Sequence, residues 1–111
     1  MSVKTEKIGN SLLKEISEIL RFEARDEDLK EVDLTYVKAT GDLEYAKIYY
    51  TILDRAKRDK IQMALDKAAG YIRSQLAQRV ELRHIPELKF VYDEALDYGE
   101  KIEHILEEIK N

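Results

Sequence analysis

The sequence predicts one small α+β domain, spanning residues 1–111, in which helices cover one face of a three-stranded sheet. Apolar residues recur at helical spacing near both ends and in the middle of the chain. In three other runs they alternate with neighbouring residues at strand spacing. A chain of 111 residues is long enough for one core and too short for two domains.

The first helix is expected from Lys4 to Phe22. Its apolar residues form a single stripe: Ile8, Leu12, Leu13, Ile16, Ile19 and Leu20. The lysines at positions 4, 7 and 14 fall on the polar side, where a solvated face is the simplest role. An acidic segment, residues 23–28, follows and is expected to form a polar loop.

Two strands are expected next. The first run alternates at Val32, Leu34 and Tyr36, and the second alternates at Ala46, Ile48, Tyr50 and Ile52. The short turn at Gly41-Asp42 predicts an antiparallel hairpin. Tyr45 and Tyr49 would face away from the Ile48 side, where they could stack nucleobases, cover the sheet or pack against a helix.

Gly70 is the unusual residue of the middle helix. Glycine in a helix interior costs about 1 kcal/mol relative to alanine, so it predicts a kink that divides the helix, with a second helix over about Tyr71–Val80. The second helix would offer unpaired amides to an anion, between Lys67 and Arg73. The alternative is that Ala68, Ala69 and Gly70 only allow close packing.

Beyond the middle helix, Pro86 is expected to open a third strand. Leu88, Phe90 and Tyr92 alternate there with Glu87, Lys89 and Val91. Asp93 can then cap a final helix. The apolar stripe of that helix comprises Ala95, Tyr98, Ile102, Ile105, Leu106 and Ile109, and its outer face is acidic.

The charge of the chain is unevenly distributed. Its 19 basic and 23 acidic residues give a net charge of −4, which argues against indiscriminate nucleic-acid binding. Residues 55–89, however, hold 9 basic and 4 acidic groups. Asp54 can cap the middle helix, and Arg55, Lys57, Arg58 and Lys60 follow at the end of the helix dipole that disfavours cations. This block indicates an anionic partner, although a solvated face is the alternative.

Several other classes of function are disfavoured. The chain has no cysteine and only two histidines, so no cofactor or metal is expected. It has no apolar run of membrane-spanning length and no secretory segment at its start, so a soluble, cytoplasmic protein is expected. Catalysis by paired carboxylates is an alternative, but the acidic residues fall in runs that look solvated, and no nucleophile motif accompanies them.

Several runs of residues, in order along the chain, resemble the ribosome-binding factor A family. Residues 68–74, Ala-Ala-Gly-Tyr-Ile-Arg-Ser, resemble the family's kink, and residues 82–93 resemble its most specific signature. Residues 42–49 resemble its second strand, and residues 14–20 its first helix. The loop at residues 25–28 lacks a proline common there, and position 95 is alanine where serine is common.

The resemblance implies a KH-like domain of the second type, in which an Ala-x-Gly kink replaces the Gly-x-x-Gly loop. It implies a monomeric, non-enzymatic RNA-binding factor that binds free or immature 30S ribosomal subunits. Such a factor supports late maturation and 5′-end processing of 16S rRNA, supports growth in the cold, and leaves before translation. The implied contacts lie near the 5′-terminal helix of 16S rRNA and the decoding region.

For such a role we expect phosphate-led recognition of folded rRNA with little sequence readout. The expected RNA-binding residues are the kink and the surrounding cations: Lys57, Arg58, Lys60, Lys67, Ala68, Ala69, Gly70, Arg73, Arg79, Arg83 and Lys89. The alternative is a protein-interaction module that binds a basic ribosomal protein through its acidic last helix. The acidic residues of that helix are Glu100, Glu103, Glu107 and Glu108.

Overall fold

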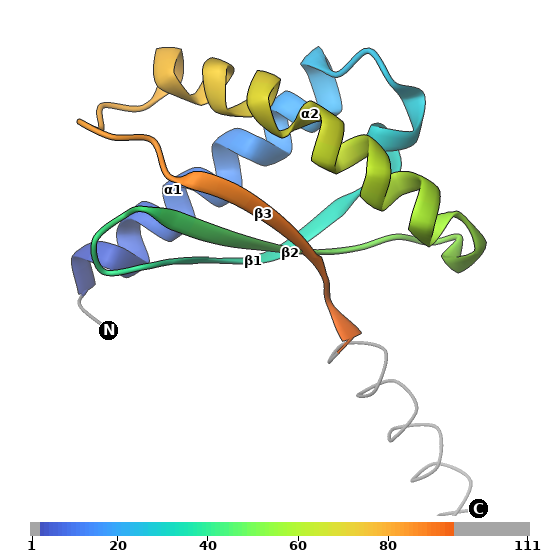
Figure 1. The fold of residues 1–111 in the computed structure, drawn as a ribbon, viewed down its shortest axis with the longest axis horizontal. Helices are drawn as coiled ribbons and strands as arrows, with labels where there is room; N and C mark the ends of the chain where they lie inside the picture. Colours follow the sequence, from blue (N-terminus) through green and yellow to red (C-terminus); the bar gives the residue numbers. More distant parts are fainter. Residues whose placement is uncertain (1–2, 95–111) are drawn as a thin grey trace, which may run out of the picture.

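The computed structural model of the chain describes residues 3–94 (Figure 1). The main elements are α1 (Val3–Glu18), β1 (Asp33–Ala39), β2 (Tyr45–Thr51), α2 (Arg58–Arg79) and β3 (Glu87–Tyr92). Three short helical turns join them: Ile19–Glu23, Glu27–Glu31 and Arg55–Lys57. The predicted α+β class is confirmed, and so is the element order except that one helix stands where two were predicted. The helix expected after Asp93 lies outside the described residues.

The apolar stripe of α1 packs against the sheet as predicted. Leu12, Ile16, Ile19 and Leu20 are each at most 1% exposed. The helix ends in a π-helical turn, in which the Ala24 amide donates to the Ile19 carbonyl at 3.0 Å. This turn brings the observed end close to the predicted one.

Part of the polar segment that follows α1 is a 3₁₀ turn, Glu27–Glu31, rather than the predicted loop. Asp26 caps this turn by accepting a hydrogen bond from the Asp28 amide at 2.9 Å. Leu29 anchors it to the core and is 4% exposed. A single apolar residue in an acidic run is too weak a periodic signal to predict such a turn.

The strands β1 and β2 form the predicted antiparallel hairpin. Between them, Asp42 accepts hydrogen bonds from the Thr40 hydroxyl at 2.7 Å and the Glu44 amide at 3.1 Å. These two bonds, the Thr40 one first, hold the pKa of the Asp42 carboxyl below its usual value. Leu43 occupies the left-handed region with φ 59°.

The predicted alternation in β1 is wrong beyond Leu34. The register slips between Leu34 and Tyr36, so Val37 and Ala39 are buried and Tyr36 is 44% exposed. A bulge moves the following side chains to the opposite face of a strand, because the side-chain period is two residues. The alternation predicted in β2 and β3 is confirmed.

The sheet order is β1-β2-β3, and β3 runs parallel to β2. Parallel neighbours need a crossover connection, which α2 provides. Figure 1 shows α1 and α2 on the same face of the sheet, which confirms the predicted layering. No described element covers the other face.

The helix α2 is continuous through Gly70, so the predicted division into two helices is wrong. The axis changes direction near the middle of α2 in Figure 1, but helical hydrogen bonding persists and leaves no free amides there. The reason is tertiary packing. Ile61 and Leu65 before Gly70, and Ile72 and Leu76 after it, are all buried along one stripe. This burial outweighs a glycine penalty of about 1 kcal/mol.

Tyr50 is the largest fully buried side chain of the core. Its hydroxyl donates to Gln62 Oε1 at 2.5 Å, and Gln62 Nε2 donates to the Phe90 carbonyl at 2.9 Å. The Tyr50 and Tyr92 rings meet edge to face at 5.7 Å. Burial raises the pKa of the Tyr50 phenol above its ordinary value.

Candidate nucleic-acid interface

Three of the predicted RNA-binding cations lie at the start of α2, and each pairs with a carboxylate from another part of the chain. Lys57 Nζ lies 3.3 Å from Glu31, and Lys60 Nζ lies 3.0 Å from Asp28. Arg58 lies 2.9 Å from Glu94, and its guanidinium also covers the Tyr92 ring at 4.4 Å. The first helical turn is therefore largely charge-balanced.

All three cations remain partly exposed to solvent although they are paired. The hydrogen bond to Asp28 raises the pKa of Lys60, and the one to Glu94 raises the pKa of Arg58, so both stay cationic at neutral pH. The side chains of Lys57, Arg58 and Lys60 are 38%, 46% and 70% exposed. Exposed ion pairs stabilise by only about 0–1 kcal/mol. That range applies to the pairs with Glu31 and Glu94, whereas the Asp28 carboxylate paired with Lys60 is only 16% exposed.

The side chains of Arg73 and Arg79 form hydrogen bonds with other parts of the same chain. Arg73 donates from Nε and Nη2 to the Ile85 carbonyl, at 3.0 and 2.7 Å, and so ties α2 to the segment before β3. Arg79 donates to Glu15 and Glu18 of α1 at 3.1 Å each. It also contacts Glu23, and this bond is the main cause of its raised pKa. The sequence predicts phosphate contacts for both arginines and gives no sign of these internal partners, because the partners lie far away along the chain.

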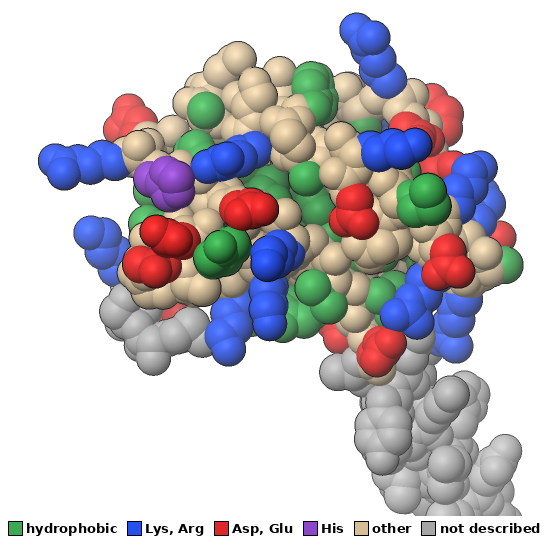
Figure 2. Space-filling model, viewed as in Figure 1, with side chains coloured by type: hydrophobic (Ala, Val, Ile, Leu, Met, Phe, Trp, Pro, Cys, Tyr) green, Lys and Arg blue, Asp and Glu red, His purple; other side chains and the backbone are tan. Residues whose placement is uncertain are grey.

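The predicted cations do not form one cluster. Arg83 is exposed in the segment between α2 and β3, and forms no ion pair with any residue in 3–94. Lys89 lies on the sheet face away from the helices, with Nζ 4.8 Å from the Tyr45 ring centroid. In Figure 2 basic side chains spread across the visible face with acidic ones among them. The proposed single basic patch is therefore divided between α2, the loop after it and the open side of the sheet.

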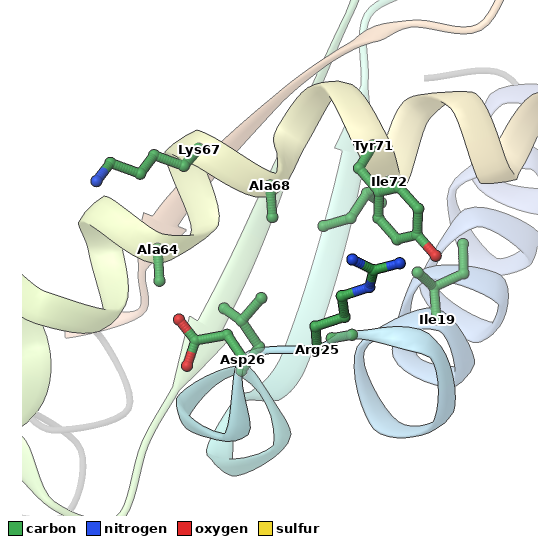
Figure 3. Close-up of a pocket in the computed structure, with 10 residues that line it drawn as sticks. Ile19, Arg25, Asp26, Ala64, Lys67, Ala68, Tyr71 and Ile72 are labelled. Carbon is green, nitrogen blue, oxygen red and sulfur yellow. The ribbon is translucent and has the colours of Figure 1, made fainter.

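The middle of α2 borders a pocket that sequence analysis missed. The pocket has a volume of about 540 Å³ and lies between α2 and residues 19–29. Apolar side chains and cationic or hydroxyl groups line it together: Ile19, Ala24, Arg25, Asp26, Leu29, Ala64, Lys67, Ala68, Tyr71 and Ile72. In Figure 3, Arg25 and Tyr71 approach each other across it, while Lys67 extends away.

The pocket exists because α2 presents small residues there. Ala64 and Ala68 are one helical turn apart and both line it, so larger side chains at these positions would fill the space. The sequence shows the alanine-rich run, but it does not indicate that residues 24–29 lie opposite this run and form the other side of the pocket. The pocket combines an apolar floor with cationic and anionic side chains, Arg25 and Asp26 among them.

No group of three His, Asp or Glu side chains within residues 3–94 is arranged to hold a metal ion. Over the same residues, no helix has the length and hydropathy of a membrane span.

The sheet order, the antiparallel and parallel neighbours, and the helices on one face define a small KH-like α+β domain. Residues 4–106 match the family model described as Ribosome-binding factor A. The ribosome-binding factor A of Macrococcus caseolyticus is 44% identical over 110 residues, which cover 98% of this chain and 96% of that protein. That of Streptococcus pneumoniae is 41% identical over 105 residues, covering 93% and 90%. The chain belongs to the ribosome-binding factor A family.

The fold is also similar to solved structures of this family. The crystal structure of ribosome-binding factor A from Thermus thermophilus has a TM-score of 0.73 at 20% identity, over 79% of this chain and 93% of that one. A homology model of a Thermus thermophilus ribosome binding factor A, fitted into a cryo-EM map of a 30S–RbfA complex, has a TM-score of 0.67 at 21% identity. That match covers 81% of this chain and 96% of the other.

Proposed function

We propose that this protein is a ribosome biogenesis factor that binds free or immature 30S subunits. In this role it supports late maturation and 5′-end processing of 16S rRNA, as a cytoplasmic, monomeric and non-enzymatic protein that aids growth in the cold. Family membership supports the proposal. So does the structural relative that was fitted into a map of a 30S complex.

The observation that carries the proposal is Gly70. It is exposed near the middle of α2 and its φ is not positive. Apart from its two chain neighbours and the adjacent helix backbone, no atom of the described residues lies within 4 Å of where a Cβ would be. Nothing described within the chain therefore requires glycine, although glycine weakens a helix by about 1 kcal/mol. A partner that comes close to the helix backbone would explain the glycine, because glycine has no Cβ to keep the partner away.

A ribose-phosphate backbone is the partner that fits this surface best. Lys67 is exposed one turn before Gly70, and Lys60 is exposed nearer the start of α2. Lys57 and Arg58 add positive charge at that end, where they pair with Glu31 and Glu94. The small side chains of Ala68 and Ala69 leave room for a partner to come close to the helix backbone. In this arrangement Arg73 and Arg79 are positioning residues that hold α2 against its neighbours, and Arg83 and Lys89 contact rRNA outside α2.

Gly70→Ala tests the close approach. We expect it to raise thermal stability, by up to about 1 kcal/mol in free energy of unfolding, and to weaken binding to 30S subunits at least tenfold. Co-sedimentation with separated 30S, 50S and 70S particles measures binding, and the wild-type protein should migrate selectively with 30S.

Ser74→Ala is the matched control, because Ser74 is also exposed on α2 and alanine is the better helix former. It should raise stability and leave 30S binding unchanged. If Gly70→Ala bound 30S as tightly as Ser74→Ala, no partner would approach the helix at Gly70.

The alternative function assigns binding to the acidic last helix and a basic ribosomal protein. The residues of that helix lie outside the described part of the chain. Nuclease treatment separates the two functions, because capture through rRNA is lost on digestion and capture through a ribosomal protein survives it.

A further inference from the structure

The face of the sheet opposite the helices carries a row of three lysines. Lys38 of β1 is the register partner of Lys47 on β2, and Lys47 is the partner of Lys89 on β3. All three are exposed, and none forms an ion pair with another residue in 3–94. Like charges directly opposite one another destabilise a sheet, so this row opposes folding unless something anionic covers it.

The next row along the strands is apolar and aromatic. Tyr36, Tyr49 and Val91 are register partners across the sheet, with Tyr36 44% and Val91 36% exposed. The Tyr36 and Tyr49 rings lie 6.2 Å apart at 33°. The bulge in β1 creates this row, because it turns Tyr36 away from the core.

A hollow of about 370 Å³ lies on the cationic side of this face. Its lining includes all three lysines and a further tyrosine: Lys38, Ala39, Thr40, Tyr45, Lys47 and Lys89. The ring of Tyr45 is already held in place by the Lys89 ammonium at 4.8 Å. An exposed aromatic ring beside fixed cations recurs in proteins that bind single strands.

We propose that this open sheet face binds unpaired RNA, with bases stacked on Tyr36 and Tyr45 and phosphates on Lys38, Lys47 and Lys89. Adjacent side chains on one face of a strand are about 7 Å apart, which matches the offset between a base and its own phosphate. Neighbouring strands are about 4.8 Å apart, so the backbone positions of the three lysines form a row across the sheet. Charge complementarity and flat rings together favour RNA over an acidic protein, which would use only the lysines.

This inference extends the proposed function, because it adds a second RNA-contacting surface on the side of the molecule away from Gly70. The probe is a short, unstructured oligouridylate labelled for fluorescence anisotropy, with the full-length protein. The triple variant Lys38→Gln, Lys47→Gln, Lys89→Gln should bind at least tenfold more weakly. The slope of log affinity against log salt should fall by about 2, at about 0.7 per single-strand phosphate. Its thermal stability should stay equal or rise.

The matched control is Lys4→Gln, Lys7→Gln, Lys14→Gln, which removes the same charge from exposed positions on α1. It should leave oligouridylate binding nearly unchanged. Equal losses in the two triple variants would mean that net charge alone attracts RNA, and the proposal would fail. A triple sheet variant that lost thermal stability and kept its RNA affinity would mean that the lysines stabilise the fold and do not bind RNA, which also overturns the proposal.

Tyr36 tests stacking separately from charge. Tyr36→Ala should weaken binding at least about fivefold, whereas Tyr36→Phe keeps the flat ring and should bind as the wild type does. The protein has no tryptophan, so oligouridylate should quench its tyrosine fluorescence directly. If Tyr36→Ala bound unchanged, no base would stack there. Because this probe is a short single strand, its failure would leave 30S co-sedimentation, and with it the proposed function, intact.

Discussion

At the scale of single residues, two glycines on helices have opposite surroundings. A Cβ on Gly70 would meet no atom within 4 Å, whereas one on Gly9 would lie 2.8 Å from the Val37 carbonyl oxygen. Gly9 is buried where α1 crosses β1. Gly70 therefore faces open space that a partner could fill, whereas Gly9 lets α1 lie against the backbone of β1.

Gly9→Ala should therefore destabilise the protein, despite the better helix propensity of alanine. The new methyl group would force α1 away from β1, and overpacking of this kind costs about 1–3 kcal/mol. Thermal denaturation followed by circular dichroism measures the effect. An unchanged or raised midpoint would mean that α1 can shift without loss of packing.

The raised pKa of Tyr50 predicts how the free energy of unfolding changes at alkaline pH. Burial raises the pKa of its phenol in the folded protein, while the unfolded chain ionises it near its ordinary value of about 10. Above that pH the folded state binds more protons than the unfolded state, so stability falls as pH rises. Tyr50→Phe should be less stable at neutral pH, because it leaves Gln62 without its donor, but should lose less stability between about pH 9 and 11.

The measurement is the thermal midpoint of both proteins across that range. The two curves should converge as pH rises. Parallel curves would show that Tyr50 does not titrate differently in the folded and unfolded states.

At the scale of elements, α2 serves different purposes along its length. Its first turns carry exchangeable cations, and its middle borders the pocket and presents Gly70. Its second half is fixed by Arg73 to the segment before β3 and by Arg79 to α1. Rigid attachment of one half holds the exposed surface of the other half in a defined position.

Arg79→Met should show that this attachment is structural. The change leaves Glu15, Glu18 and Glu23 close together without a cation, so the thermal midpoint should fall clearly. Arg83→Met is the matched control, because Arg83 is exposed and forms no ion pair with any described residue. It should shift the midpoint by no more than about 2–4 °C, since surface substitutions usually change stability by about 0.5 kcal/mol at most. Equal midpoints in the two variants would contradict the role given to Arg79.

At the scale of the whole molecule, the net charge of −4 conceals local cationic surfaces. Binding to 30S through α2 should therefore weaken with salt, although the protein as a whole is acidic. The triple variant Lys57→Gln, Arg58→Gln, Lys60→Gln should lower the log-log salt slope by about 2, at about 0.7 per phosphate.

Glutamine is the informative substitution at these positions, because glutamate would repel Asp28, Glu31 and Glu94 and lower stability as well. The Lys4, Lys7 and Lys14 triple variant again serves as the control for charge. A slope that stayed unchanged in the α2 variant would place the 30S contacts elsewhere.

Local periodicity along the chain is enough to predict several elements of the fold. These are the extent of α1, the hairpin and the alternation in β2 and β3, because neighbouring residues suffice to specify them. The family follows instead from similarity to known relatives over nearly the whole chain. Tertiary contacts set the slip in β1, the continuity of α2 through Gly70 and the internal roles of Arg73 and Arg79. Strand pairing aligns Lys38, Lys47 and Lys89 in one row. The physical reason is that packing and strand pairing join residues far apart in the chain, and such contacts leave no local pattern.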